Sequence, residues 1–277
     1  MIRAAVAFTL LAWAGGAAAD ALDRIRESGT VRLAVREDAA PLSFLRDGAP
    51  AGVTVEICLR LVERLAEQLG VEALEPAFVI VDAETRFAAV ADGEADLLCG
   101  AATVTLARRG MVDFSIPVFV DGASVLTLEG GPDDFADLAM KRVGVRAGTT
   151  TARALRATLG RAGIQAAVVE VDDHAEGLAH VRDGVVDAYF ADQSILMSLA
   201  LAAPPEPRLN VSGNVLSVEP QALAMALGET RLRLEVDRAL SRMWRAGEIA
   251  AVFERAFGPI PPGDILQALG LLAPIPE

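Results

Sequence analysis

Along the chain, segments in which hydrophobic and polar residues alternate, as in a strand, are followed by segments in which hydrophobic residues recur at helical spacing. Residues 31–35 alternate as in a β-strand, and from Thr54 apolar side chains recur at helical spacing until Gly70 ends the pattern. A second strand is predicted at 78–81. Strands that alternate with helices are typical of parallel sheets covered by helices, so the pattern predicts an α/β fold.

The second half of the chain repeats the pattern of the first half. The segment 92–100 is matched by 183–192, and each contains a helix end, a glycine stop and a short apolar strand. A strand at 142–145, a helix at 149–159 and a strand at 167–171 precede the second copy. The repeat predicts two lobes, each built on a βαβαβ unit.

Two further strands are predicted between the lobes, one at 124–127 and one within 215–225. If both cross between the lobes, they form a two-strand hinge. The first lobe then comprises residues 20–125 plus 217–277, and the second lobe comprises 126–216. A fold of this kind buries a small ligand in the cleft between its lobes and closes on it.

The first 19 residues have the composition of a secretory signal peptide. A basic start at Arg3 is followed by an apolar run over 4–13 and by small residues over 15–19. We predict cleavage after Ala19 and export to the periplasm. A membrane anchor is the alternative, but the run is shorter than the roughly 20 apolar residues that a span needs.

Composition excludes some partners and gives no sign of catalysis. Lys and Arg total 25 against 38 Asp and Glu, a net charge of −13, so no nucleic acid partner is expected. The chain lacks the G-x-S-x-G, GK[ST] and C-x-x-C motifs. His174 and His180 are six residues apart and cannot form an i, i+4 metal pair. We therefore expect no catalytic residue, metal site or cofactor.

The chain has two cysteines, Cys58 in a predicted helix and Cys99 at the end of an apolar strand. A disulfide is one interpretation in an oxidising compartment. Both positions also suit buried thiols, and two cysteines do not make a disulfide scaffold. We expect two separate free thiols.

Polar residues follow several predicted strands at the ends where open α/β sheets bind ligands. They are Arg36, Thr103, Arg108, the segments 148–151 and 172–174, and Asp192. The threonines after Gly148 open a helix, whose free N–H groups attract an anion, although they are also typical helix caps. Cations and amide donors at some ends and a carboxylate at another suit a zwitterionic ligand.

Several motifs carry a resemblance to a known family. They are Pro-Leu-Ser-Phe at 41–44, Thr103-x-x-x-x-Arg108 with Asp-Phe-Ser at 113–115, Gly-Thr-Thr at 148–150, and the segment 187–192. Across essentially the whole mature chain, the sequence resembles the periplasmic substrate-binding proteins of polar amino-acid ABC importers (solute-binding protein family 3). It is most similar to their glutamate/aspartate-binding branch. The resemblance implies a type II periplasmic binding protein fold and a monomer that delivers an amino acid to an inner-membrane ABC permease.

The resemblance also implies roles for individual residues. Arg108 is expected to bind the ligand α-carboxylate and Asp192 the α-ammonium. The other expected substrate-binding residues are Phe44, Ala101, Thr103, Thr149 and Thr150, together with Arg36, Arg86 and His174 toward a distal carboxylate. Ala83 and Ala101 stand where the acidic-ligand branch has hydroxyls, and the loss of these hydroxyls either weakens the case for an acidic ligand or enlarges the pocket. An acidic or larger carboxylate-bearing amino acid is the predicted ligand.

An enzyme on the same scaffold is the alternative function. The fold also includes a cyclohexadienyl or arogenate dehydratase, in which an acid in the cleft protonates a leaving hydroxyl. The nearby carboxylates that could take this role are Glu37, Asp172 and Asp173.

Overall fold

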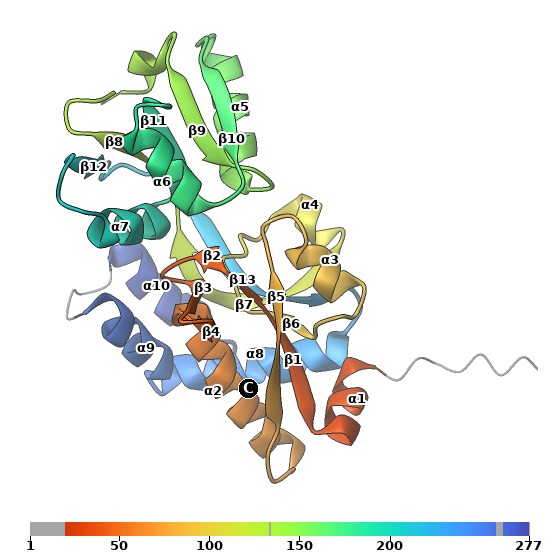
Figure 1. The fold of residues 1–277 in the computed structure, drawn as a ribbon. Coiled ribbons are helices and arrows are strands. Elements are labelled where there is room, and N and C mark those ends of the chain that lie inside the picture. Colours follow the sequence, from red (N-terminus) through yellow and green to blue (C-terminus); the bar gives the residue numbers. More distant parts are fainter. Residues whose placement is uncertain (1–19, 133, 259–262, 277) are drawn as a thin grey trace, which may run out of the picture.

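The computed structural model describes residues 20–132, 134–258 and 263–276, which form two lobes (Figure 1). Each lobe contains a five-stranded mixed sheet with helices on both faces. The predicted two-lobed α/β fold is confirmed. The expected signal peptide, residues 1–19, lies outside the described residues.

The first lobe is built on a sheet with the order β5-β1-β6-β13-β7. Its strands are β1 (Thr30–Arg36), β5 (Glu75–Val81), β6 (Leu97–Leu98), β7 (Val112–Asp121) and β13 (Glu219–Ala226). A small second sheet contains β2 (Asp38–Ala39), β3 (Ser43–Arg46) and β4 (Ala49–Ala51). The helices are α1 (Ala21–Ser28), α2 (Val53–Leu69), α3 (Arg86–Ala91), α4 (Leu106–Arg109), α8 (Thr230–Arg245), α9 (Glu248–Phe257) and α10 (Asp264–Leu272).

The second lobe is built on a sheet with the order β10-β9-β11-β8-β12. Its strands are β8 (Ala123–Leu128), β9 (Arg142–Arg146), β10 (Ala167–Val171), β11 (Ala188–Asp192) and β12 (Leu209–Val211). The helices are α5 (Thr150–Ala162), α6 (His174–Arg182) and α7 (Gln193–Ala202), with a 3₁₀ turn η1 at Phe135–Leu138. β9 pairs in parallel with β10 and β11, while β8 is antiparallel to β11 and β12.

The chain passes between the lobes at Gly122 and again just before β13. The predicted boundary at 125/126 falls inside β8, which pairs as a whole within the second sheet, so the first crossing comes earlier. The two crossings lie in contact, because a side chain on Gly122 would come within 2.2 Å of the Ser217 carbonyl oxygen. Glycine is therefore required where the strands of the hinge meet.

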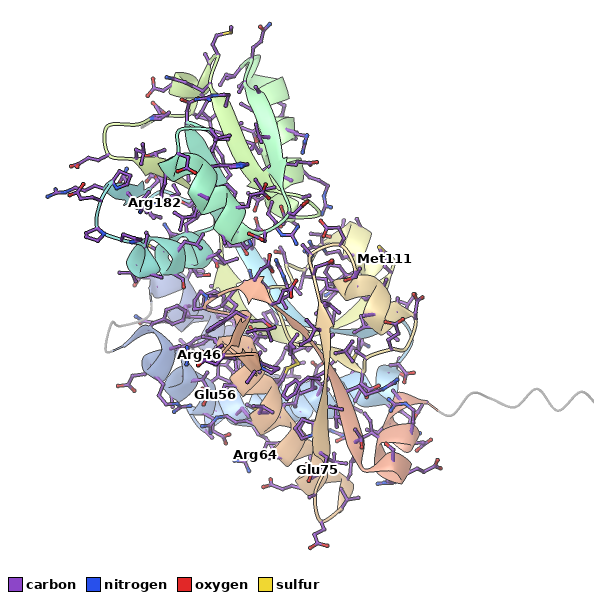
Figure 2. The ribbon with its side chains drawn as sticks, viewed as in Figure 1. Arg46, Glu56, Arg64, Glu75, Met111 and Arg182 are labelled. Atoms are coloured by element: carbon purple, nitrogen blue, oxygen red, sulfur yellow. A yellow bond between two sulfur atoms is a disulfide. The ribbon has the colours of Figure 1, made fainter. Side chains whose placement is uncertain are left out.

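Apolar periodicity explains how the first sheet is covered. Alternate residues of β1 face opposite sides: Leu33 packs in the cluster that contains α2, α8 and α9, and Ala34 packs in the cluster that contains α3. The buried face of α2 includes Leu61 and Leu65 at helical spacing. Glu56 and Arg64 lie on the outer side of the same helix (Figure 2).

A disulfide joins Cys58 on α2 to Cys99 directly after β6, with Cα atoms 6.2 Å apart. The expectation of two free thiols is wrong. Both cysteines are fully buried, as expected, but α2 crosses the sheet so that Cys58 lies over the end of β6. The bond therefore ties the helix to the segment that leads into Ala101 and Thr103.

Candidate functional site

A cavity of about 340 Å³, open solvent at its mouth included, lies between the lobes. It brings together all the expected substrate-binding residues except Phe44: Arg36, Arg86, Ala101, Thr103, Arg108, Thr149, Thr150, His174 and Asp192. Phe44 on β3 is not among the lining residues, and the guanidinium of Arg46 lies over its ring at 5.2 Å. Sequence reasoning missed Arg146, Phe190, Ala191 and Ile195, which also line the cavity. Thr151, which the sequence analysis named only as part of the segment 148–151, lines it too.

Strand ends and one helix start position these side chains. Arg36, Arg146 and Asp192 are the last residues of β1, β9 and β11, whose carboxyl ends face the cleft. Thr149 caps α5: its hydroxyl accepts from the Ala152 N–H at 3.1 Å and donates to the Arg146 carbonyl at 2.8 Å. The N–H groups in the first turn of α5 thus face a cavity lined by cations, an arrangement suited to an anion.

Arg108 lies on α4 and is almost completely buried. Its Nη1 donates to the Thr103 carbonyl oxygen at 2.7 Å, and its guanidinium lies 4.6 Å from the centroid of the Phe87 ring. Burial and the nearby Arg153 lower the pKa of Arg108 to about 10, so the group remains charged at neutral pH. A fixed guanidinium of this kind can bind a carboxylate through two hydrogen bonds.

Glu219 at the start of β13 contacts threonines of both lobes. Its Oε2 accepts from the Thr103 hydroxyl at 2.8 Å and from the Thr150 hydroxyl at 3.0 Å, while its Oε1 accepts from Ser217 at 2.7 Å. A hydroxyl has one proton, so neither threonine hydroxyl has a proton left for a ligand carboxylate while these bonds hold. The expected substrate-binding residues Thr103 and Thr150 therefore share an acceptor, Glu219, that the sequence analysis did not name.

Asp192 is the cavity carboxylate that the sequence predicted. Its Oδ2 accepts from Gln221 Nε2 at 2.9 Å, and its Oδ1 accepts from the Thr151 hydroxyl at 3.4 Å. Burial and the nearby carboxylates of Asp121 and Glu219 raise the pKa of Asp192 to about 7. A ligand ammonium at this position would favour the ionised form, because an opposite charge lowers a carboxyl pKa.

Arg36 and Arg86 are the two most deeply buried cations of the cavity, each 2% exposed. Arg36 pairs with Asp38, and Arg86 donates to the Ala83 carbonyl oxygen and, at 3.5 Å, to the Gly148 carbonyl oxygen. Burial, with the neighbouring Arg36 and Arg108, holds the pKa of Arg86 well below its usual value. The Nε atoms of both arginines have no hydrogen-bond partner within the described part of the chain. Unpaired buried donors are costly, and an anion would satisfy them.

His174, the first residue of α6, supplies a neutral donor. Burial, followed by the charge of Arg36, lowers the pKa of His174 to about 3. Its Nδ1 lies 2.7 Å from the hydroxyl of Tyr189, whose pKa is raised by burial. We assign the Tyr189 hydroxyl as the donor and Nδ1 as the acceptor, because the neutral imidazole then carries its proton on Nε2. Nε2 is buried and has no partner among the described residues, so it can donate to a ligand.

Arg146 is the most informative residue that the sequence analysis missed. Its Nε donates to Asp38 at 3.0 Å and its Nη1 to Glu84 at 3.1 Å. Burial alone would raise the pKa of Asp38, but the charges of Arg36 and Arg146 hold it below its usual value. Arg146 directly follows the predicted strand 142–145, so the strand-end rule that selected Arg36 would have found it.

Neither a metal centre nor the suggested acids of a dehydratase are found here. Within the described ranges, no group of three His, Cys, Asp or Glu side chains could hold a metal ion. Glu37, Asp172 and Asp173 do not line the cavity, and Asp173 instead caps α6 by accepting from the Glu176 N–H at 2.7 Å. The cavity combines one carboxylate with four buried guanidinium groups, which suits a zwitterion that carries a second anionic group.

Comparisons with known proteins show sequence similarity along most of the chain. The model of the bacterial extracellular solute-binding proteins, family 3, matches residues 31–259. An L-glutamate/L-aspartate-binding protein of Pseudomonas aeruginosa is 30% identical, over 92% of this chain and 85% of that protein. A glutamate/aspartate import solute-binding protein of Escherichia coli is 24% identical, over 91% of this chain and 84% of that protein.

A solved structure is similar over most of the chain. It is an ancestral amino acid-binding protein described as a precursor of cyclohexadienyl dehydratase, with a TM-score of 0.75 and 26% identity. The match covers 86% of this chain and 100% of that chain.

Proposed function

Because this chain belongs to the bacterial extracellular solute-binding proteins, family 3, we propose that it captures an acidic amino acid, glutamate or aspartate, between its lobes. The ligand α-carboxylate binds Arg108 and the N–H groups at the start of α5. The α-ammonium binds Asp192, and the side-chain carboxylate binds Arg36, Arg86 and the Nε2 of His174.

One observation carries this proposal. Arg36 and Arg86 are buried in the cavity wall with unpaired Nε donors, and the His174 Nε2 beside them is unpaired as well. An apolar side chain would leave these donors unsatisfied, and the amide of glutamine offers only one acceptor oxygen. A carboxylate offers two acceptor oxygens and a negative charge that pairs with the guanidinium groups. A small number of charge-assisted hydrogen bonds, each worth about 1.5 to 3 kcal/mol, is enough for micromolar affinity after association costs.

Calorimetry with purified protein and a panel of amino acids tests the ligand class. Glutamate and aspartate should bind in the micromolar range, and glutamine should bind at least tenfold more weakly. Arg36→Ala should reduce this preference for glutamate over glutamine. Arg46→Ala is a control, since Arg46 is an exposed cation of the same lobe outside the cavity. Equal affinity for glutamate and glutamine would contradict the proposal.

We also propose that the protein binds its ligand without converting it. The relatives described above are named as binding proteins, and the acids suggested for a dehydratase lie outside the cavity. Asp192 has the raised pKa that a general acid needs. A carboxylate that binds the ligand ammonium would occupy the same place in the cavity, so the raised pKa does not require catalysis. Incubation with prephenate or arogenate should give no product. Turnover that is lost in Asp192→Asn would favour the enzyme.

Delivery to an importer completes the proposed function. We propose that residues 1–19 direct export to the periplasm, where the protein acts as a monomer and docks on an inner-membrane ABC permease. The part of the chain that the structure describes contains no helix long and apolar enough to cross a membrane. Cell fractionation and N-terminal sequencing of the exported protein test the cleavage after Ala19.

A further inference from the structure

Arg146 belongs to the second lobe, but its two carboxylate partners belong to the first. Asp38 lies on β2, and Glu84 lies in the loop between β5 and α3. The bonds are 3.0 Å from Nε to Asp38 Oδ2 and 3.1 Å from Nη1 to Glu84 Oε1. The guanidinium of Arg146 therefore spans the cleft between the lobes.

Burial makes the Arg146–Asp38 ion pair sensitive to lobe movement. The Arg146 side chain is 4% exposed and that of Asp38 is 11% exposed. A conformation that keeps a charge buried without its partner is strongly destabilised, unless water solvates that charge. Opening the cleft would separate Arg146 from both carboxylates at once, so these contacts favour the closed arrangement.

Asp38 is held in place by its own lobe. Arg36, two residues earlier, pairs with the other oxygen of the same carboxylate, so Asp38 keeps a cationic partner whether or not Arg146 is near. Arg36 is also one of the arginines proposed to bind the ligand side chain. The ligand subsite and the contact between the lobes therefore share one carboxylate.

The backbone around Arg146 packs directly against the first lobe. Gly148 has a φ of +68°, and a side chain there would come within 2.9 Å of Glu84 Oε1 and 3.2 Å of the Ala83 carbonyl oxygen. The Gly148 carbonyl oxygen accepts from Arg86 at 3.5 Å. This second contact between the same two segments is independent of the Arg146 side chain.

We propose that Arg146 is a positioning residue for lobe closure, which pairs with Asp38 and Glu84 only when the lobes meet and thereby sets the affinity for the ligand. The inference rests on the proposed function in that the cleft closes on a bound amino acid. It does not depend on which amino acid binds.

The test compares Arg146→Gln with Arg142→Gln. Arg142 lies on the same strand, but its partner Asp187 belongs to the same lobe, so it is the matched control. X-ray scattering should give a larger radius of gyration for ligand-free Arg146→Gln than for the ligand-free wild type. Saturating glutamate should bring the two values together. Glutamate affinity should fall about tenfold in Arg146→Gln, as for the loss of a close ion pair, and stay unchanged in Arg142→Gln.

Glu84→Gln provides a variant at a half-exposed position, where misfolding is not expected. It should weaken binding less than Arg146→Gln, because Asp38 remains. The double variant should bind almost as well as Arg146→Gln alone, since both changes remove the same ion pair. If the losses of glutamate affinity in Glu84→Gln and Arg146→Gln simply add in the double variant, the proposed pairing of Glu84 with Arg146 is wrong.

The outcomes separate this inference from the proposed function. An unchanged radius of gyration in Arg146→Gln overturns the closing role, and if affinity also falls, Arg146 contacts the ligand directly. If the wild type binds no acidic amino acid but Arg146→Gln is still more open, the closing role holds and the proposed ligand is wrong.

Discussion

The hydroxyl of Thr103 in the first lobe donates to Glu219 Oε2 at 2.8 Å, and the same oxygen accepts from Thr150 of the second lobe. Glu219 is the first residue of β13, directly after the second crossing of the hinge. One carboxylate thus connects two threonines that line the cavity from opposite lobes.

Glu219→Ala should weaken ligand binding, because it removes the carboxylate through which Thr103 and Thr150 connect the two lobes. The expected loss of glutamate affinity is about tenfold, measured by calorimetry. Ser217→Ala is the control, since Ser217 donates to the other oxygen of Glu219, accepts from the Ala123 N–H and does not line the cavity. An equal loss in both variants would show that hinge stability, and not the link between the lobes, determines affinity.

Arg108→Ala should abolish measurable binding. The variant removes the cation proposed to bind the ligand α-carboxylate and leaves that charge unpaired in a buried site, at a cost of about 3 to 5 kcal/mol. Arg109→Ala, at the exposed next position of α4, should bind glutamate like the wild type. Near-wild-type affinity in Arg108→Ala would refute the assignment.

Asp192 should make both stability and binding depend on pH. Its pKa of about 7 exceeds the ordinary value of 3.8, so the folded state holds this proton more tightly than the unfolded chain. The group therefore stabilises the fold below about pH 4, and this contribution is lost as the pH rises through 7. Denaturant titrations of ligand-free protein should show a smaller decline between pH 4 and 7 in Asp192→Asn than in the wild type.

Ligand binding should change with pH in the opposite direction. An ammonium needs the ionised carboxylate, so wild-type affinity for glutamate should fall as the pH drops below about 7. Asp192→Asn should bind weakly at every pH and lose this dependence. A wild-type affinity that is constant between pH 5 and 8 would contradict the proposed role of Asp192.

The sequence was most informative where local rules apply. Arg36 and Asp192 follow apolar strands, and the carboxyl ends of parallel strands meet at a cleft, so their approximate placement could be predicted. Arg146 follows the strand 142–145 and obeys the same rule, although only the threonines after Gly148 are expected from the sequence at this strand end. Its pairing with Asp38 and Glu84 depends on how the two lobes close on each other. The hydrophobic periodicity of the sequence does not predict that arrangement.

Other features depend on contacts between distant segments. Glu219 begins an antiparallel strand, and its place beside Thr103 and Thr150 follows from the path of the second crossing. The disulfide depends on where α2 crosses the sheet. Helical spacing shows which face of α2 is buried, but it does not show which residue lies over the end of β6.

The Cys58–Cys99 disulfide should stabilise the first lobe. The two cysteines are 41 residues apart, and closing a loop of this length lowers the entropy of the unfolded chain by the equivalent of about 4 kcal/mol. Reductant should therefore shift the denaturant midpoint of the wild type downward, and the variant with Cys58→Ala and Cys99→Ala should be less stable and insensitive to reductant. Glutamate affinity should fall as well, because Cys99 anchors the segment that carries Ala101 and Thr103. If thiol titration shows complete reduction of the wild type while midpoint and affinity stay constant, packing alone holds α2 on the sheet and the bond is dispensable for the site.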